Sequence, residues 1–318
     1  MKRVLIIVVL ATMLFSCEAQ SQIELINAMV GQQSQGPVLV GVKSIANNKV
    51  QLTFDKFIKA ERADFNFDNS LIKVESVNTK EQTLTLVLNK AINGGKKEDL
   101  KAHVTDLSGN SLTFTIGIWG YNSNLPHLLI NEFTTKGSGN NPDRVELIVL
   151  EQGDLAGITL YDGVKDDYDS CTILPPFLVK KGDYIVIEFS EELRGAHPIE
   201  FFGGEVGLGA NNGVITLYDS PEGDIIDAVI YSNLSSTQFG GFGTRKVEER
   251  VRVLELTNHW LPKPINNSDC IDSSDSTATR SMCRTLGKED TNRKADWHIV
   301  PTGKSSFGFD NVTDRYTK

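Results

Sequence analysis

Short apolar runs separated by turn residues fill the segment from residue 37 to residue 121. The run at residues 83–88 (TLTLVL) alternates polar and apolar side chains with a period of two, which is typical of a strand with one buried face. Clusters of Asn and Gly between the runs favour turns. The predicted strands are residues 38–42, 50–54, 71–77, 83–88 and 112–118. Several short strands at this spacing predict a small β-sandwich.

A second β-rich region begins at residue 128, after a linker of residues 122–127. Its predicted strands are residues 128–133, 143–150, 157–161, 184–189, 213–218 and 225–231. The expected fold class is therefore all-β, with two β-sandwiches in sequence. We place the two domains at residues 37–121 and 128–312.

Residues 236–275 break the β pattern and predict a short helical insertion. Val247, Val251 and Leu254 fall at i, i+4 and i+7, with charged residues between them, which favours an amphipathic helix of about 12 residues. Pro262 and Pro264 prevent its extension. We expect this helix to cap the open end of the second sandwich, with binding of a partner as the alternative.

The first residues have the pattern of an export signal. Two basic residues precede an almost purely apolar run, residues 4–15, which is too short to span a bilayer core of about 30 Å. The run ends in LFSC at residues 14–17, and this ending resembles the lipobox of bacterial lipoproteins. The resemblance implies that residues 1–16 are removed as a signal peptide and that Cys17 becomes a lipid-modified N-terminus. An ordinary signal peptide followed by an unrelated Cys is the alternative.

A lipid, rather than charge, would hold the mature chain on a membrane. Removal of residues 1–16 takes away Lys2 and Arg3 and no acidic residue, so the net charge of -9 becomes -11. Such an acidic body is not attracted to an anionic membrane, whereas two or more acyl chains, at about 0.8 kcal/mol per buried CH₂, give a stable anchor. The next residue is Glu18 and not the Asp that in some bacteria retains a lipoprotein in the inner membrane, so we expect the outer membrane. Residues 17–36, rich in Gln and Ser, are expected to form a tether.

The order of motifs after residue 128 resembles the lamin-tail domain. The chain contains LLINEF at 128–133, DRVELIVL at 143–150, DIIDAVIYS at 224–232 and ADW at 295–297. The Trp that usually follows the D-L-x-G motif of that family is replaced here by Ile158. The resemblance covers about residues 128–235 and 276–312, and it implies an Ig-like sandwich interrupted by the insertion.

Residues 37–121 resemble bacterial Ig-like domains of the SbsA-like type. The resemblance rests on the opening LVGVKSIANNKVQLTF at 39–54 and the closing VTDLSGNSLTF at 104–114. The segment has no Cys…Trp…Cys pattern, so the antibody type of Ig domain is excluded.

Four residues are implied as site residues by the lamin-tail pattern. Glu132 and Glu146 recur in it as acids, and Arg280 or Arg284 as a base. We expect them to tie strands together across the sandwich, for example as a partly buried Glu–Arg pair, with contact to a ligand as the alternative. Trp297 is expected in the core, where its N–H needs a partner.

Three Cys remain after Cys17, and an exported protein can keep disulfides. A bridge between Cys270 and Cys283 would close about 14 residues and contribute roughly 3 kcal/mol. Pairing of Cys171 with either of them is the alternative. The chain has no C-x-x-C motif, which argues against redox catalysis and a zinc knuckle.

An acidic run offers the only candidate for a metal. Asp162, Asp166, Asp167 and Asp169 could hold Ca²⁺ through carboxylate oxygens, but they do not match the Ca²⁺ loop pattern, and a solvated hairpin tip is the alternative. No other cofactor is expected. The five His residues show no metal-ligand spacing, and no G-x-S-x-G motif is present.

The sequence therefore predicts a lipid-anchored envelope protein that is not an enzyme and acts as a binding, adhesion or scaffold module. Its partners would be the membrane, through the lipid, and a protein or another envelope component. An accessory or substrate-binding component of an exported hydrolase, or a metal-dependent enzyme, is the alternative. The acidic charge argues against nucleic acid as a partner.

Overall fold

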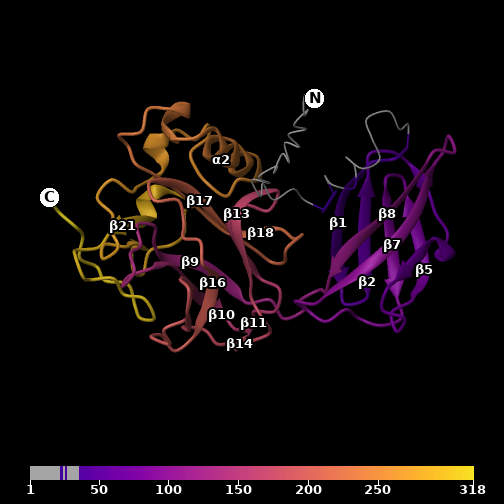
Figure 1. The fold of residues 1–318 in the computed structure, drawn as a ribbon, viewed down its shortest axis with the longest axis horizontal. Coiled ribbons are helices and arrows are strands. Elements are labelled where there is room, and N and C mark those ends of the chain that lie inside the picture. The colour runs from indigo at the N-terminus through magenta and orange to yellow at the C-terminus, as the bar shows by residue number, and fades with distance from the viewer. Residues whose placement is uncertain (1–21, 24–25, 27–35) are drawn as a thin grey trace, which may run out of the picture.

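The computed structural model describes residues 22–23, 26 and 36–318, and Cys17 lies outside these residues. Strands dominate the chain, and Arg245–Thr257 forms the one long helix of the described part, α2. The prediction of an all-β fold is confirmed. Two sandwiches lie side by side in Figure 1, the first in indigo and purple and the second in magenta to yellow.

The first sandwich, residues 37–121, packs two sheets around an apolar core. One sheet has the order β1 (Leu39–Ala46), β2 (Lys49–Phe54), β6 (Thr83–Leu88), β5 (Val74–Lys80). The other consists of β3 (Ile58–Lys59), β4 (Phe65–Phe67), β7 (Lys97–Asp106) and β8 (Ser111–Trp119), and a short 3₁₀ turn, Arg62–Asp64, precedes β4. Phe54 and Phe114 meet across the core with ring centroids 6.3 Å apart, which joins the two sheets.

The second sandwich, residues 127–312, has a six-stranded and a five-stranded sheet. The six-stranded order is β16 (Glu200–Gly204), β15 (Tyr184–Phe189), β10 (Asp143–Glu151), β9 (His127–Thr134), β20 (Met282–Arg284), β21 (Trp297–Ile299). The five-stranded order is β13 (Asp167–Ile173), β12 (Thr159–Val164), β17 (Asn212–Tyr218), β18 (Ile225–Ser232), β19 (Ile271–Asp272). Short pieces complete it: β11 (Gly153–Asp154), β14 (Leu178–Val179) and 3₁₀ turns at Phe239–Gly241, Asn267–Asp269 and Lys294–Asp296.

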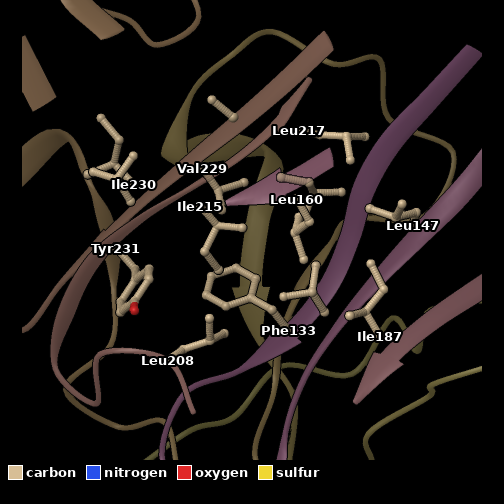
Figure 2. Packing of buried hydrophobic residues seen from close by; sticks show 14 of the residues in the cluster. Phe133, Leu147, Leu160, Ile187, Leu208, Ile215, Leu217, Val229, Ile230 and Tyr231 are labelled. Carbon is tan, nitrogen blue, oxygen red and sulfur yellow. The ribbon is translucent and has the colours of Figure 1, made fainter. Parts of the chain in front are cut away.

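The core of the second sandwich lies between its two sheets. Figure 2 shows Phe133 and Leu147 of the six-stranded sheet facing Ile215 and Leu160 of the five-stranded sheet. These side chains are at most 1% exposed. Burial of a side chain of this size contributes about 1.5–3 kcal/mol, so this core is the main source of stability of the domain.

Helix α2 is the predicted amphipathic helix. It begins after Thr244, whose hydroxyl accepts a hydrogen bond from the Val247 backbone N–H at 3.2 Å, and it ends at Asn258 in the left-handed conformation. The three apolar positions that predicted it are buried. The helix packs against β12 and β17, so it covers one face of the five-stranded sheet.

The two sandwiches meet at a junction formed by β1, the linker after β8, and turns of the second sandwich. The Lys43 ammonium lies 2.5 Å from an Asp224 carboxylate oxygen. The side-chain amide of Asn122 donates to the backbone carbonyls of Asp154 and Ala156 at 2.7 and 3.1 Å. Gly95 has a φ of +71° and so little space toward the second sandwich that a Cβ there would lie 2.9 Å from a backbone nitrogen.

In the described residues, no helix is both long enough and apolar enough to cross a bilayer.

Candidate functional site

A β-bulge in β9 brings the candidate acids into one buried layer. Between the positions of Ile130 and Glu132, β9 has one residue more than its neighbour β10, so Asn131 is an extra residue. The bulge breaks the period of two. Ile130 and Phe133 therefore both face the core, while Asn131 and Glu132 face the chain segment that follows β21.

Glu132 is fully buried and accepts hydrogen bonds at both carboxylate oxygens. Ser306 donates its hydroxyl at 2.7 Å and its backbone N–H at 3.0 and 3.1 Å, and the Ser281 hydroxyl is a further donor. Burial raises the pKa of Glu132, and the hydrogen bonds from the two serines oppose that rise. All donors come from the chain itself, so the carboxylate fixes residues 281 and 306 to the sheet.

Glu146 stands opposite Glu132 on β10 and is also fully buried. It accepts a hydrogen bond from the Asn131 amide at 2.7 Å and another from the Gly308 backbone N–H. Burial raises the pKa of Glu146 to about 8, and the nearby Glu132 carboxylate adds to the rise. Glu146 is therefore largely protonated at neutral pH.

Two amides complete this layer, which we call the acid layer. Asn131 and Asn311 exchange side-chain hydrogen bonds of 3.0 and 2.9 Å. The members of the acid layer are Asn131, Glu132, Glu146, Ser281, Ser306 and Asn311. The layer joins β9 and β10 to the segment after β21, and its polar atoms are used in that connection rather than presented to a ligand.

Arg284 occupies a second buried polar site on the other face of the same sheet. Its guanidinium donates to Asp227 at 2.7 Å, to Asp290 at 2.6 Å and to the Ile130 carbonyl at 2.6 Å. It also lies 4.8 Å from the ring centroid of Trp297. Arg284 thus ties both sheets and the loop before β21 together.

In the described residues, no ion pair joins Glu132 or Glu146 to Arg280 or Arg284. The expectation of a Glu–Arg pair among these four residues was therefore wrong. Cys283 is the residue of β20 that stands opposite Glu132. Because side chains alternate along a strand, the neighbouring Arg284 points to the opposite face and meets Asp227. Arg280 precedes the strand, and its guanidinium stacks over the Tyr316 ring at 4.3 Å.

The four aspartates proposed for Ca²⁺ do not come together in one site in the described residues. Asp167 and Asp169 bind the Arg250 guanidinium of α2 at 3.0 and 2.7 Å. Asp162 is buried, and burial raises its pKa to about 7, with the charge of Asp169 adding to the rise. Asp166 is exposed and lines a cavity at the junction. The part of the chain that the structure describes contains no group of three His, Cys, Asp or Glu side chains that could hold a metal.

Cys270 and Cys283 do not form the predicted disulfide, and Cys171 is a free thiol as well. The reason lies in the topology. Cys270 directly precedes β19 at the edge of the five-stranded sheet, whereas Cys283 lies inside β20 of the six-stranded sheet. Burial raises the pKa of Cys270 to about 12, which keeps it a thiol.

A Cys–His pair was not foreseen from the sequence. Cys283 and His298 stand opposite each other in β20 and β21, with the thiol sulfur 3.5 Å from Nε2. That Nε2 also lies 3.1 Å from the Val312 carbonyl, which only accepts, so a hydrogen bond there places the ring proton on Nε2 and leaves Nδ1, 4.0 Å from the sulfur, as the acceptor of the ring. Burial raises the pKa of the Cys283 thiol far above its usual range. The pair therefore lacks the features of an activated nucleophile. The sequence does not reveal this pair, because 15 residues separate the two side chains and their contact depends on how β20 and β21 are aligned.

Trp297 lies in the core, 5% exposed, and packs edge to face on Phe133 with ring centroids 5.4 Å apart. Its indole N–H has no hydrogen-bond partner among the described residues, so the predicted partner is missing.

Comparison with known proteins gives one family match. The model of the family described as "TP_1001_2nd: protein second domain" matches residues 126–198 and 203–299, which is more than half of the chain. The match starts one residue before β9 and ends with β21, so it spans the strands of the second sandwich and stops before the segment that carries Ser306 and Asn311. No curated protein matches the chain.

Two crystal structures show a weak likeness. The N-terminal part of the bacterial S-layer protein SbsC is 16% identical with a TM-score of 0.26, and 60% of this chain matches 42% of that one. The S-layer protein rSbsC is 13% identical with a TM-score of 0.25, at 60% and 40% coverage. The chain thus spans less than half the length of either structure, and a likeness of this size carries no argument about fold or function. The family match, in contrast, covers more than half of the chain, and it shows that the chain belongs to the TP_1001_2nd family.

Proposed function

We propose that the protein is an envelope protein anchored on the outer membrane by acyl chains on Cys17, and that its two sandwiches bind or scaffold other envelope components without catalysis. For the body of the protein, the proposal rests on one observation: the candidate site residues are buried and form hydrogen bonds within the fold. Glu132 and Glu146 are 0% exposed and accept hydrogen bonds from the chain itself. A catalytic acid or base has to reach a substrate proton, and these two carboxyls do not.

The anchor is supported by the first residues. Two basic residues, an apolar run and the LFSC ending fit a lipoprotein signal, and only a thiol can carry the thioether-linked lipid. The charge of the mature body, -11 after removal of Lys2 and Arg3, supports attachment by lipid rather than by electrostatic attraction.

The identities of the two modules form part of the proposal. The motifs at 39–54 and 104–114 support an SbsA-like Ig domain for the first sandwich, and those at 128–133, 143–150 and 295–297 support a lamin-tail type for the second.

The anchor is tested by Cys17→Ser in the full chain. We expect the wild-type protein in the membrane fraction with acyl mass on the N-terminal Cys, and the variant in the soluble fraction or unprocessed. Cys171→Ser is the matched control, because Cys171 is an exposed free thiol in a described strand and its loss should leave the fractionation unchanged. Membrane partitioning equal to that of the wild type, in Cys17→Ser protein from which residues 1–16 have been removed, would overturn the anchor.

The assignment to the outer rather than the inner membrane is tested by Glu18→Asp. We expect the wild-type protein to co-sediment with outer-membrane markers on a density gradient and the variant to shift toward the inner membrane. Protease treatment of intact cells then separates the two faces of the outer membrane. Cleavage of the body before lysis assigns it to the cell surface, and protection assigns it to the periplasm.

A further inference from the structure

The N-terminal segment is attached to the first sandwich at β8. The side-chain carbonyl of Gln22 accepts a hydrogen bond from the Gly117 backbone N–H at 2.9 Å. Among the described residues, strand β8 pairs with β7 alone, so this N–H lies on the edge of its sheet and is open to an acceptor from outside the sheet. Ile26 is 8% exposed and belongs to the core of the first sandwich. Residues 22 and 26 are therefore both held to the first sandwich.

This point of attachment lies at the junction between the sandwiches. Gly117 lines a cavity of about 100 Å³ together with Lys43 of β1 and Glu222 of the second sandwich. Ile23 lines an adjoining cavity of about 460 Å³ together with Asp166 and other residues of both sandwiches. The chain thus enters the body at the junction and not at an outer end of the molecule.

Only five peptide units separate Gln22 from Cys17. A fully extended chain spans at most about 3.5 Å per residue, so the Cys17 sulfur can lie no more than about 17 Å, plus its own side chain, from the attachment point. An acylated Cys places its acyl chains inside the bilayer and its own backbone at the headgroups.

We propose that the headgroup surface of the membrane lies against the junction face of the protein, which is the surface lined by Lys43, Asp166 and Glu222. Residues 17–22 then act as a short leash that holds the body in one orientation. The inference rests on the proposed lipidation of Cys17. The occupant of the junction face follows from the length of the leash, because no globular partner fits between the junction and a bilayer about 17 Å away. The strands farthest from the junction, β5 above all, are then left free for envelope partners.

The orientation is tested on acylated full-length protein in vesicles of phosphatidylethanolamine and phosphatidylglycerol that contain a headgroup nitroxide lipid. In a Cys171→Ser background, an environment-sensitive fluorophore is placed on Asp166→Cys at the junction or on Ser76→Cys of β5, both of which are exposed. Strand β5 is three strand spacings, about 14 Å, from β1 in its sheet. We expect nitroxide quenching several-fold stronger at residue 166 than at residue 76.

A lengthened leash is the control. Insertion of twenty Gly and Ser residues after Ala19 should leave vesicle flotation unchanged and reduce quenching at residue 166 to the level at residue 76. Equal quenching at the two positions in protein that floats with the vesicles overturns the orientation and leaves the anchor intact. Protein that carries no acyl mass and does not float overturns the anchor itself.

The attachment is tested separately by Gln22→Ala. Backbone amide exchange at Gly117, followed by NMR in the full chain without its acyl chains, should accelerate at least tenfold in the variant, because the amide loses its acceptor. Gln51→Ala, on β2 of the other sheet of the first sandwich, should leave Gly117 unchanged. Equal exchange in Gln22→Ala and wild type would overturn the short leash.

Discussion

The two sandwiches differ in how they treat polar side chains. In the described part of the first sandwich, Asp106 is the one polar or charged residue that is buried, and it closes a turn by accepting bonds from the backbone of Ser108 and Asn110. The second sandwich buries acids, amides, hydroxyls and two arginines. Among buried side chains, apolar ones therefore account for nearly all the stabilisation of the first sandwich, whereas the second also depends on polar groups that are costly if left unpaired. Similar architectures can thus respond very differently to pH and to substitution.

The largest effect should come from Arg284→Met in the second sandwich. The variant leaves the buried Asp227 without its cation, and the removal of one partner from a buried pair costs about 3–5 kcal/mol. Urea unfolding followed by hydrogen exchange of peptides from each sandwich measures this loss and should confine it to the second sandwich. Arg245→Met is the control, because Arg245 is 78% exposed and pairs only with Glu249 at 3.7 Å, which is worth less than about 0.5 kcal/mol. Equal losses in the two variants would contradict the proposed dependence on buried pairs.

A somewhat smaller effect is expected from Leu86→Ala in the first sandwich. Leu86 is 0% exposed, and the cavity left by its truncation should lower the free energy of unfolding by about 3 kcal/mol. The same peptide-resolved measurement should show the loss in residues 37–121 and the same loss at pH 5 and pH 8. Val87→Ala on the outer face of the same strand should cost less than about 1 kcal/mol. A loss that differs between pH 5 and pH 8 would contradict the expectation that the stability of the first sandwich does not depend on buried titratable groups.

The last expected effect is a pH dependence confined to the second sandwich, which is small within one pH unit and builds up over several. The pKa of Glu146 in the folded chain, about 8, lies above its value of 4.5 in the unfolded chain, so unfolding releases a proton between these values. The stability from this group is complete below about pH 4.5 and is lost as the pH rises through 8. The slope is at most about 1.4 kcal/mol per pH unit.

The variant Glu146→Gln keeps an acceptor and a similar shape without titrating. The difference in unfolding free energy between wild type and Glu146→Gln should therefore change steadily from pH 5 to pH 8, with the variant gaining relative stability at the alkaline end. Denaturant titrations at four pH values give this difference curve. A flat curve would show that Glu146 is ionised in the folded protein at neutral pH.

The strands that sequence reasoning found are those with clear alternation, such as β6 and β10. Strand β5 begins at Val74 and not at residue 71, because the turn before it is fixed by side-chain amides: Asn69 accepts from the Leu71 N–H, and Asn89 from the Lys73 N–H. Strand β7 was missed because charged residues fill its exposed face, although Leu100, Ala102 and Val104 alternate on its buried face.

The candidate site was predictable in its residues but not in its pairing. Glu132 and Glu146 were identified from the pattern, yet the partners of Glu132 come from residues 149 and 174 positions away, and periodicity carries no information at that range. The bulge at Asn131 is likewise invisible to a period-of-two reading, because it is the extra residue that turns two neighbouring polar side chains to one face. Arg250 could not be assigned to the acidic hairpin before the helix was placed against β12.

The long separation between β9 and its partners has a consequence for the order in which the chain becomes ordered during synthesis. The first sandwich has all its strands once Trp119 has emerged, so it can close early and locally. The second sandwich cannot, because its acid layer lacks Ser306 and Asn311 until those residues have been synthesised. Its buried polar connection therefore closes last, long after the strands of the first sandwich have met.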